Sequence, residues 1–250
     1  TYTWCREAGF QNINVDLMAA LPYQIVESYT TGLRKIIRLA PEHISAYSLI
    51  LEEGTPFYQK YNSGCYPLPD EEQERLMYRE TEQILAQAGY ERYEISNYAK
   101  KGYACRHNLV YWQGGDYLGL GLGSSSYMDG VRFHNTTDFN TYVNQGAYVE
   151  DREELSVQAK MEEFMFLGLR VMAGVSGTEF EKRFGKTMED VYGDVLRKHE
   201  EEGLLQIDRK EDRKEAAAAE PAKGKTNIEK VMLTTKGVDV SNYVFADFLL

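Results

Sequence analysis

The first hundred residues alternate between the two-residue period of β-strands and the 3.6-residue period of amphipathic helices. Strands are predicted at 12–18, 44–51 and 93–96, and helices at about 25–39 and 70–88. The order strand–helix–strand–helix–strand is typical of parallel α/β structure with right-handed crossovers. We therefore predict an α/β fold for this part of the chain.

The first predicted strand has one polar face, which carries Asn12, Asn14 and Asp16. A parallel strand that is covered on both faces normally reads as a continuous apolar run. A polar face is expected where strands line an open cavity, so the pattern indicates a segment of a (β/α) barrel. Barrel chemistry takes place at the carboxyl ends of the strands, where Asp16 would lie. The alternative role for Asp16 is a structural hydrogen bond to a neighbouring loop.

Residues 102–135 are rich in glycine and are expected to be irregular. The segment 119–126, with glycine at every second position followed by three serines, could direct several backbone amides at an anion. The spacing does not match a dinucleotide-binding fingerprint. A tight turn remains the alternative.

The last hundred residues are mainly helical. Ser156 is a predicted N-cap, and the apolar positions of 188–199 follow the helical period closely. Two short strands at 204–207 and 231–233 flank a charged, alanine-rich stretch that is expected to form a flexible insertion at about 210–227. The order indicates a winged-helix-like module. The predicted domains are therefore 1–112, a connecting region at 113–150, and 151–250.

Charge and composition narrow the partners. The hydrophobic fraction of 43% and the charged fraction of 27% are ordinary for a globular protein. No run approaches the ~18 apolar residues of a membrane-spanning helix. The net charge of −11 opposes binding to phosphate backbones, so nucleic acid is not an expected partner even for a winged helix.

The three cysteines have no spacing typical of a zinc site, a redox motif or an iron–sulfur cluster. So few cysteines, with no signal peptide in the sequence, favour a reducing compartment, and we expect a cytoplasmic location.

The segment from Cys105 to Trp112 gathers the side chains that suit a porphyrin. It contains a thiol, the guanidinium of Arg106, the imidazole of His107 and the rings of Tyr111 and Trp112. Imidazole and thiolate are common ligands of haem iron, while arginine and aromatic rings suit the propionates and the macrocycle. A structural role for His107 is the alternative.

The remaining titratable residues of interest are expected to be structural. His43 and His199 are predicted core or edge residues. Glu94 is predicted to form a buried salt bridge, and His134 is placed in a loop without an assigned role.

Six strings, in order along the chain, resemble the oxygen-independent coproporphyrinogen III oxidase-like radical SAM family. They are INVDLMAALP at 13–22, PEHISAYSLILEEGTP at 41–56, YEISNYA at 93–99, HNLVYW at 107–112, YLGLG at 117–121 and LTTKG at 233–237. The resemblance implies a partial radical SAM barrel that holds a 4Fe–4S cluster and S-adenosylmethionine, followed by a helical C-terminal domain.

The string at 107–112 is similar to the haem-chaperone branch of this family. The resemblance makes His107, Asn108, Tyr111 and Trp112 a haem-associated motif, with His107 as the candidate iron ligand, and makes Asp16 a contact of S-adenosylmethionine. It further implies delivery of haem to haem-accepting respiratory proteins, and allows peripheral membrane association and a homodimer.

The chain departs from the family pattern at the cluster. The Cys-x3-Cys-x2-Cys loop of the family is not in this sequence, and Cys5, Cys65 and Cys105 cannot replace it. Serines at 124–126 also stand where the usual motif has Ala-His-Ser. We therefore expect the chain to be part of a longer protein and to be inactive alone as an enzyme.

Two alternatives stay open. One is an oxygen-independent coproporphyrinogen III oxidase, which decarboxylates its substrate oxidatively. The other is a non-catalytic winged-helix interaction module.

Overall fold

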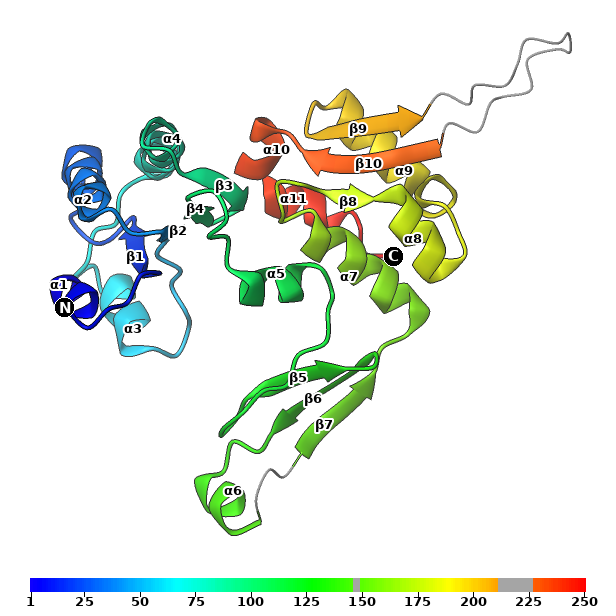
Figure 1. The fold of residues 1–250 in the computed structure, drawn as a ribbon, viewed down its shortest axis with the longest axis horizontal. Helices are drawn as coiled ribbons and strands as arrows, with labels where there is room; N and C mark the ends of the chain where they lie inside the picture. The colour runs from blue at the N-terminus through cyan, green and yellow to red at the C-terminus, as the bar shows by residue number, and fades with distance from the viewer. Residues whose placement is uncertain (146–148, 211–226) are drawn as a thin grey trace, which may run out of the picture. The chain divides into compact units, whose positions relative to one another are not determined.

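The structure, a computed structural model, describes residues 1–145, 149–210 and 227–250. The chain divides into two compact units, Thr1–Cys105 and Arg106–Leu250 (Figure 1). Apart from its end residues, Lys210 and Asn227, the predicted insertion at about 210–227 lies outside the described residues. Among the described residues, no helix has both the length and the apolar character needed to cross a membrane.

The first unit is built around a four-stranded sheet in the order β1-β2-β4-β3. Its strands are β1 (Asn14–Ala19), β2 (His43–Ser48), β3 (Glu91–Glu94) and β4 (Asn97–Ala99). Its helices are α1 (Tyr2–Glu7), α2 (Val26–Leu39), α3 (Pro56–Asn62) and α4 (Glu71–Gln87). β1 and β2 are parallel and are joined through α2, as the sequence predicts.

The third predicted strand differs from expectation. β3 ends at Glu94, the chain turns, and β4 returns to pair antiparallel with both β3 and β2. A carboxylate oxygen of Glu94 accepts hydrogen bonds from the Ser96 amide, at 3.0 Å, and from the side-chain amide of Asn97. These bonds fix the turn, so the buried acid predicted at position 94 organises a hairpin.

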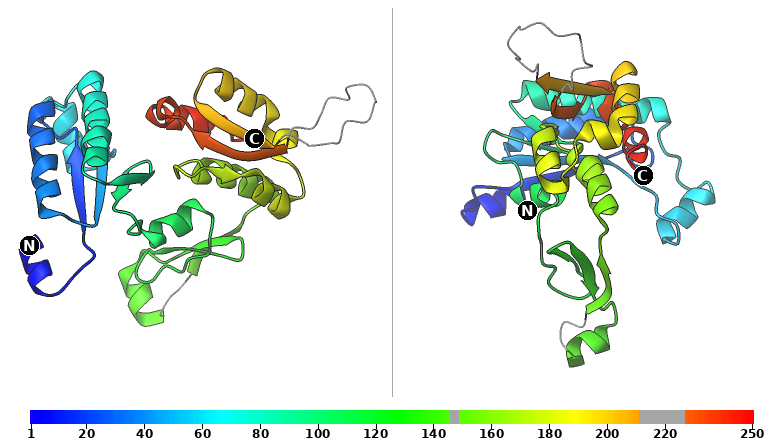
Figure 2. Two further views of the ribbon diagram at one scale, coloured as in Figure 1. Left: turned by 45° about the horizontal axis from the view of Figure 1, so that its top comes forward. Right: turned by 90° about the vertical axis from the view of Figure 1, so that its right-hand side faces the viewer.

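One face of this sheet is apolar and is covered by α2 and α4, which lie side by side (Figures 1 and 2). Leu33 of α2 and Leu85 of α4 pack with Ile44 and Tyr98 of the sheet, and all four are almost completely buried. The opposite face carries the polar side chains described below.

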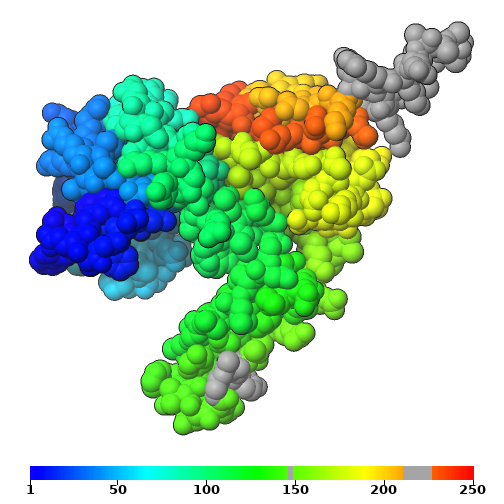
Figure 3. All heavy atoms as spheres, in the orientation of Figure 1, coloured from blue at the N-terminus to red at the C-terminus, as the bar shows by residue number. Residues whose placement is uncertain are grey.

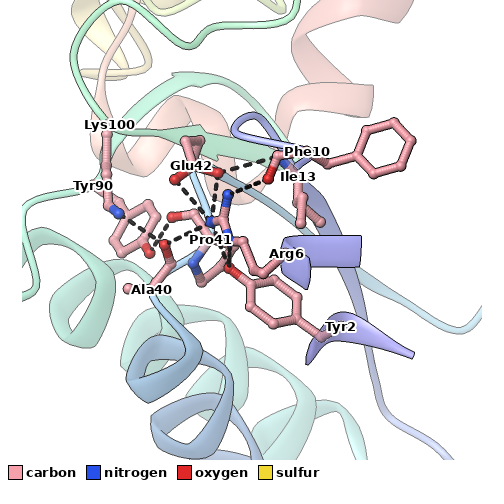
Figure 4. A network of polar contacts seen from close by, with 9 residues as sticks. All are labelled: Tyr2, Arg6, Phe10, Ile13, Ala40, Pro41, Glu42, Tyr90 and Lys100. Carbon is pink, nitrogen blue, oxygen red and sulfur yellow. Dashed lines mark hydrogen bonds and ion pairs between the residues drawn. The ribbon is translucent and has the colours of Figure 1, made fainter. Parts of the chain in front are cut away.

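An ion pair fastens α1 to the amino-terminal ends of β1 and β2 (Figure 4). Arg6 Nη2 lies 2.7 Å from Glu42 Oε2, and the same oxygen accepts the Ile13 amide at 3.1 Å. Burial alone would raise the pKa of Glu42, but these bonds hold that pKa below its ordinary value. Beside them, the Tyr90 hydroxyl donates to the carbonyl of Pro41 at 2.6 Å.

The second unit contains the winged-helix-like module predicted from the sequence. It comprises α7 (Val157–Gly168), β8 (Val175–Ser176), α8 (Gly177–Phe184), α9 (Met188–Glu201), β9 (Leu205–Lys210) and β10 (Asn227–Leu233), followed by α10 (Thr235–Asp239) and α11 (Ser241–Ala246). The sheet order is β8-β10-β9, and all its pairs are antiparallel. The predicted cap is confirmed, because Ser156 Oγ accepts the Ala159 amide at 3.0 Å.

These helices and strands enclose one hydrophobic core. In the space-filling view their outer atoms, coloured yellow-green to red, lie together (Figure 3). Phe180, Tyr192, Leu196 and Phe248 are at most 1% exposed. The three aromatic rings among them form edge-to-face contacts. The centroids of Phe180 and Tyr192 are 6.0 Å apart, and those of Tyr192 and Phe248 are 5.3 Å apart.

The C-terminal end is fastened to α9 by polar contacts. Lys198 Nζ donates to Asp247 Oδ2 at 2.6 Å, and the buried His199 places Nε2 3.0 Å from the same oxygen. Nδ1 of His199 lies 3.2 Å from Glu202 Oε2. The carbonyl of Leu250 accepts a hydrogen bond from a side chain of α7 at 2.7 Å.

Before this module, regular structure replaces the irregular region expected from the glycine content. The segment forms α5 (Arg106–Trp112), β5 (Ser125–Met128), β6 (Val131–Asn135), α6 (Phe139–Gln145) and β7 (Val149–Glu154). β5, β6 and β7 pair antiparallel. Asp129 and Gly130 join β5 to β6 with φ of 50° and 78°, the left-handed geometry that a two-residue hairpin turn requires.

Candidate functional site

The polar face of the first unit is a patterned row of side chains. Strand register places Asn14 beside His43, and Asp16 beside Ser45. Ser45 in turn pairs with Asn97 of β4. Residues that face one another across neighbouring strands share a face. The polar residues predicted for one strand therefore extend across three strands.

Hydrogen bonds link this face into a directed chain that ends at Asp16. The Asn14 side-chain amide donates to Asp16 Oδ1 at 2.6 Å, and its carbonyl oxygen lies 2.6 Å from His43 Nδ1. Ser45 Oγ donates to the same carbonyl at 3.2 Å. Nε2 of His43 lies 2.8 Å from the Tyr93 hydroxyl.

The donor and acceptor at each link follow from Asp16, because a carboxylate only accepts. The Asn14 nitrogen must face Asp16, so its oxygen faces His43, and Nδ1 of His43 must carry the proton. Nε2 is then an acceptor for the Tyr93 hydroxyl. Burial lowers the pKa of His43, and the charge of Asp16 opposes this only partly, so the neutral tautomer is favoured.

Asp16 itself is exposed on this face, and β1 continues beyond it to Ala19. Its position is therefore within the strand and not at the strand end that the sequence suggests. An exposed carboxylate held by one amide keeps other lone pairs for a ligand's hydroxyl or amino groups. These acceptor atoms suit the hydroxyl and amino groups of a nucleoside, the group that S-adenosylmethionine would present.

The second candidate site is on α5 in the other unit. His107 and Tyr111 are one helical turn apart, with Nε2 of the imidazole 3.0 Å from the Tyr111 hydroxyl and ring centroids 4.8 Å apart. Tyr117 follows with its centroid 4.4 Å from Tyr111, and Tyr127 lies 6.3 Å farther along the series. A row of four rings therefore begins at an exposed imidazole.

The His107 imidazole has a nitrogen lone pair with which it could coordinate iron. Nδ1 has no hydrogen-bond partner within 1–145, 149–210 and 227–250, and when Nε2–H donates to Tyr111 the Nδ1 lone pair is free. Histidines that bind metal generally donate their other N–H in this way, which fixes the tautomer.

The four residues of the haem-associated motif do not share one face. Asn108 is half-buried, and the ring of Trp112 packs under the guanidinium of Arg170, 4.4 Å from the ring centroid. Within the motif, His107 and Tyr111 are joined by a hydrogen bond and by an edge-to-face ring contact.

The glycine-rich segment forms a tight turn. The amide of Gly119 donates to Ser126 Oγ at 3.0 Å, and the amide of Gly123 donates to the Thr136 carbonyl at 3.0 Å. A Cβ on Gly119 would lie 2.3 Å from the Ser125 carbonyl oxygen, so only glycine fits there. These amides therefore point into the protein, which favours the tight-turn interpretation over the anion site.

Known proteins of similar sequence have names that refer to haem and porphyrin chemistry. The HemN C-terminal domain family matches residues 155–211. The haem chaperone HemW of Lactococcus lactis is 36% identical over 248 residues, which cover 98% of this chain and 60% of that protein. HemW of Bacillus subtilis is 38% identical over 204 residues, covering 80% of this chain and 54% of that protein.

A solved structure shows the same fold. Coproporphyrinogen III oxidase (HemN) of Escherichia coli, described as a radical SAM enzyme, matches with a TM-score of 0.75 at 18% identity, over 99% of this chain and 57% of that one. The chain belongs to the coproporphyrinogen III oxidase-like radical SAM family. The predicted fold, a partial barrel followed by a mainly α, winged-helix-like C-terminal domain, is confirmed.

This radical SAM chain spans about half the length of the curated relatives that it matches. A 4Fe–4S cluster and S-adenosylmethionine are implied for the full-length relatives by their family. Cys5, Cys65 and Cys105 are free, and within the part of the chain that the structure describes no three His, Cys, Asp or Glu side chains gather as metal ligands. These residues do not fit a cluster, so no reaction step is assigned to one here.

The sequence predicts the burial of two histidines but does not predict their hydrogen-bond partners. His43 and His199 are buried, as expected. The hydrogen bonds of His43 to Asn14 and Tyr93 were missed, although the polar alternation of the first strand was the available signal. His134 lies in β6 and not in a loop; its Nε2 is 2.9 Å from Asp151 Oδ2.

Proposed function

We propose that this chain is the haem-binding portion of a haem chaperone, with His107 as the axial ligand of the iron. The observation that carries the proposal is the exposed imidazole of His107, oriented by Tyr111 at the start of a row of aromatic rings. The two HemW relatives are named as haem chaperones, which supports the same cargo for this chain.

The geometry suits transfer more than permanent retention. An exposed histidine can coordinate iron while leaving the other axial side of the macrocycle open to the ligand of an acceptor protein. Haem-accepting respiratory proteins are the proposed acceptors, and the cytoplasm is the proposed location. Peripheral membrane association and a homodimer stay predictions.

For the longer parent protein, we infer that Asp16 contacts S-adenosylmethionine. The support is the orientation of its carboxylate by Asn14, which is held in turn by His43. When bound to a reduced cluster in a complete protein, that cofactor would supply radical chemistry. The residues of this chain would only bind and orient it.

Titration of ferric haem into the chain and into a His107→Ala variant tests the proposal. We expect a shifted Soret band in the unaltered chain, and weaker binding with loss of that shift in the variant. His134→Ala is the matched control, because His134 also belongs to the second unit and should not affect the spectrum. Equal affinity and identical Soret spectra in the His107→Ala variant would exclude His107 as the ligand.

The alternative function, a coproporphyrinogen III oxidase, is supported by the similarity of the fold to HemN. The sequence identity of 18% supports a common fold but not a common activity. The oxidase alternative predicts decarboxylation of coproporphyrinogen by the longer protein with a reconstituted cluster. Haem binding without any decarboxylated product would decide for the chaperone.

A further inference from the structure

The second unit contains a cleft of about 580 Å³ that includes neither Asp16 nor His107, although Trp112 and Tyr127 of the second candidate site contribute to its lining. One wall is formed by the end of α5 and the turn between β5 and β6, and the other by α7, β8 and α8. Small-molecule sites commonly occupy roughly 300–1,000 Å³ and combine apolar walls with a few polar groups. The size is therefore that of a site for an organic molecule.

Aromatic rings supply the apolar part of the lining: Trp112, Tyr127, Phe164 and Phe184. Phe164 and Phe184 meet edge to face, with centroids 5.8 Å apart. Rings held in this way offer flat and edge contacts to a planar ligand at little cost in side-chain entropy.

A cation without a partner lies at the same cleft. Lys160 extends from α7 to the turn, where a Cβ on Gly130 would lie only 2.5 Å from its Nζ. Glycine at this position therefore leaves space for the ammonium group. In the described parts of the chain, Lys160 makes no ion pair.

The other strong charges in the lining are mostly compensated. Glu163 accepts two hydrogen bonds from Arg132, at 2.9 and 3.1 Å, and Arg183 donates to Glu179 at 2.7 Å. Asp129, on the turn, adds one negative charge near the cleft. Lys160 is thus the group that a ligand's carboxylate would neutralise, and Asp129 is the group that would oppose it.

We propose that this cleft binds a planar aromatic ring that carries a carboxylate. Given the proposed haem function, on which this assignment of the ligand rests, the ring is a porphyrin with a propionate on Lys160. The lining contains no histidine, cysteine or methionine, and burial raises the pKa of its one tyrosine, Tyr127, which opposes the tyrosinate form that binds iron. The proposed binding mode therefore holds the macrocycle without coordinating its metal. Binding there is consequently independent of iron and of His107.

The test uses metal-free protoporphyrin IX and intrinsic fluorescence. The chain has two tryptophans, so Trp4→Phe leaves Trp112 in the cleft as the only tryptophan emitter. In that background we expect saturable quenching. Lys160→Gln should weaken binding about tenfold, which corresponds to the ~1.4 kcal/mol of a modest charge-assisted contact. Asp129→Asn should tighten it a few-fold, and Lys182→Gln, an exposed cation on α8 outside the lining, should leave it unchanged.

The opposite charges at Lys160 and Asp129 make the test specific for this cleft. Equal affinity in the Lys160→Gln and Lys182→Gln variants, or no saturable binding at all, would overturn the proposal. Loss of metal-free porphyrin binding in His107→Ala would also overturn it, because that result means a single site at the imidazole. If ferric haem loses its Soret shift in His107→Ala while protoporphyrin binding persists, both proposals stand. If the spectra of ferric haem do not depend on His107 but Lys160 still controls protoporphyrin binding, the cleft stands and the proposed ligand role falls.

Discussion

The sheet of the first unit and the sheet β8-β10-β9 of the second unit differ in how their faces are covered. The sheet of the first unit packs only its apolar face, on α2 and α4, and leaves Asp16, His43 and their neighbours on the other face. The sheet of the second unit belongs to a core that is closed by helices and filled with aromatic rings such as Phe180 and Phe248. The contrast indicates that the sheet of the first unit offers a binding surface, whereas the sheet β8-β10-β9 builds a structural core. The candidate sites of the second unit are instead on α5 and in the cleft beside Lys160.

Glycines show the same contrast at the level of the backbone. In the second unit a Cβ on Gly174 would lie 2.1 Å from the Val231 carbonyl oxygen, and one on Gly237 would lie 2.0 Å from that of Leu204. In the first unit a Cβ on Gly32 or Gly89 would meet nothing within 4 Å. The core of the second unit therefore leaves no room for a side chain at Gly174 and Gly237, whereas α2 leaves room at Gly32.

Phe180→Ala should have the largest effect. Truncating a completely buried phenylalanine typically lowers the free energy of unfolding by about 3–5 kcal/mol, because it removes apolar contacts and leaves a cavity. Urea unfolding combined with hydrogen exchange should show the loss in the second unit. Phe139→Ala, at a phenylalanine that is 65% exposed in the same unit, should change the free energy by less than about 0.5 kcal/mol. Similar losses in the two variants would contradict a closed core.

His43→Ala should have an intermediate effect that depends on pH. The variant leaves the Asn14 carbonyl and the Tyr93 hydroxyl without this partner, at a cost of about 1–3 kcal/mol. The pKa of His43 is lower in the folded state than its ordinary value of 6.5, so the unfolded state binds the proton more readily and acidification below that value destabilises the fold.

Unfolding measured at pH 7.5 and at pH 5.5 should therefore show a stability that falls with acidification in the unaltered chain and falls less in His43→Ala. Ser45→Ala is the control, since it removes only the 3.2 Å hydrogen bond to the same carbonyl and leaves the titrating imidazole of His43 in place. An unchanged pH slope in His43→Ala would show that the imidazole does not contribute as described.

Gly32→Ala should produce the smallest effect, and one of opposite sign. Gly32 lies within α2 with open space beside it, so alanine should stabilise the helix by about 0.5–1 kcal/mol. Gly174→Ala should destabilise, because φ is 70° and a backbone oxygen occupies the position of the new methyl group. Thermal unfolding of both variants checks the signs, and a loss in Gly32→Ala would show that α2 is packed more closely than the structure has it.

Much of the fold could be predicted because local signals agreed with packing. The period of 188–199 predicts α9, where Met188, Tyr192, Leu196 and His199 are buried, and Ser156 caps α7 as expected. The β3–β4 turn could not be predicted, since it depends on Glu94 accepting bonds from two groups on the far side of the turn. The β5–β6 hairpin differs from the irregular segment that the glycine content predicts, because Asp129-Gly130 between alternating residues forms a two-residue hairpin turn.

The candidate sites could likewise be predicted only in part from the sequence. Polar alternation identifies the face on which Asp16 lies, because side-chain direction follows directly from strand period. It does not identify His43 or Tyr93 as its distant supports, since cross-strand register is a tertiary property. The cleft near Lys160 has no sequence motif, because its walls come from segments that meet only after folding.

The attachment of the last residues to α9 has a practical consequence for protein engineering. Phe248 fills the core, and Asp247 holds both Lys198 and the buried imidazole of His199. Removal of the final four residues would leave Lys198 and His199 without the Asp247 carboxylate and would open a cavity where Phe248 lies. An affinity tag on this chain should therefore follow Leu250 through a spacer and should not replace residues 247–250.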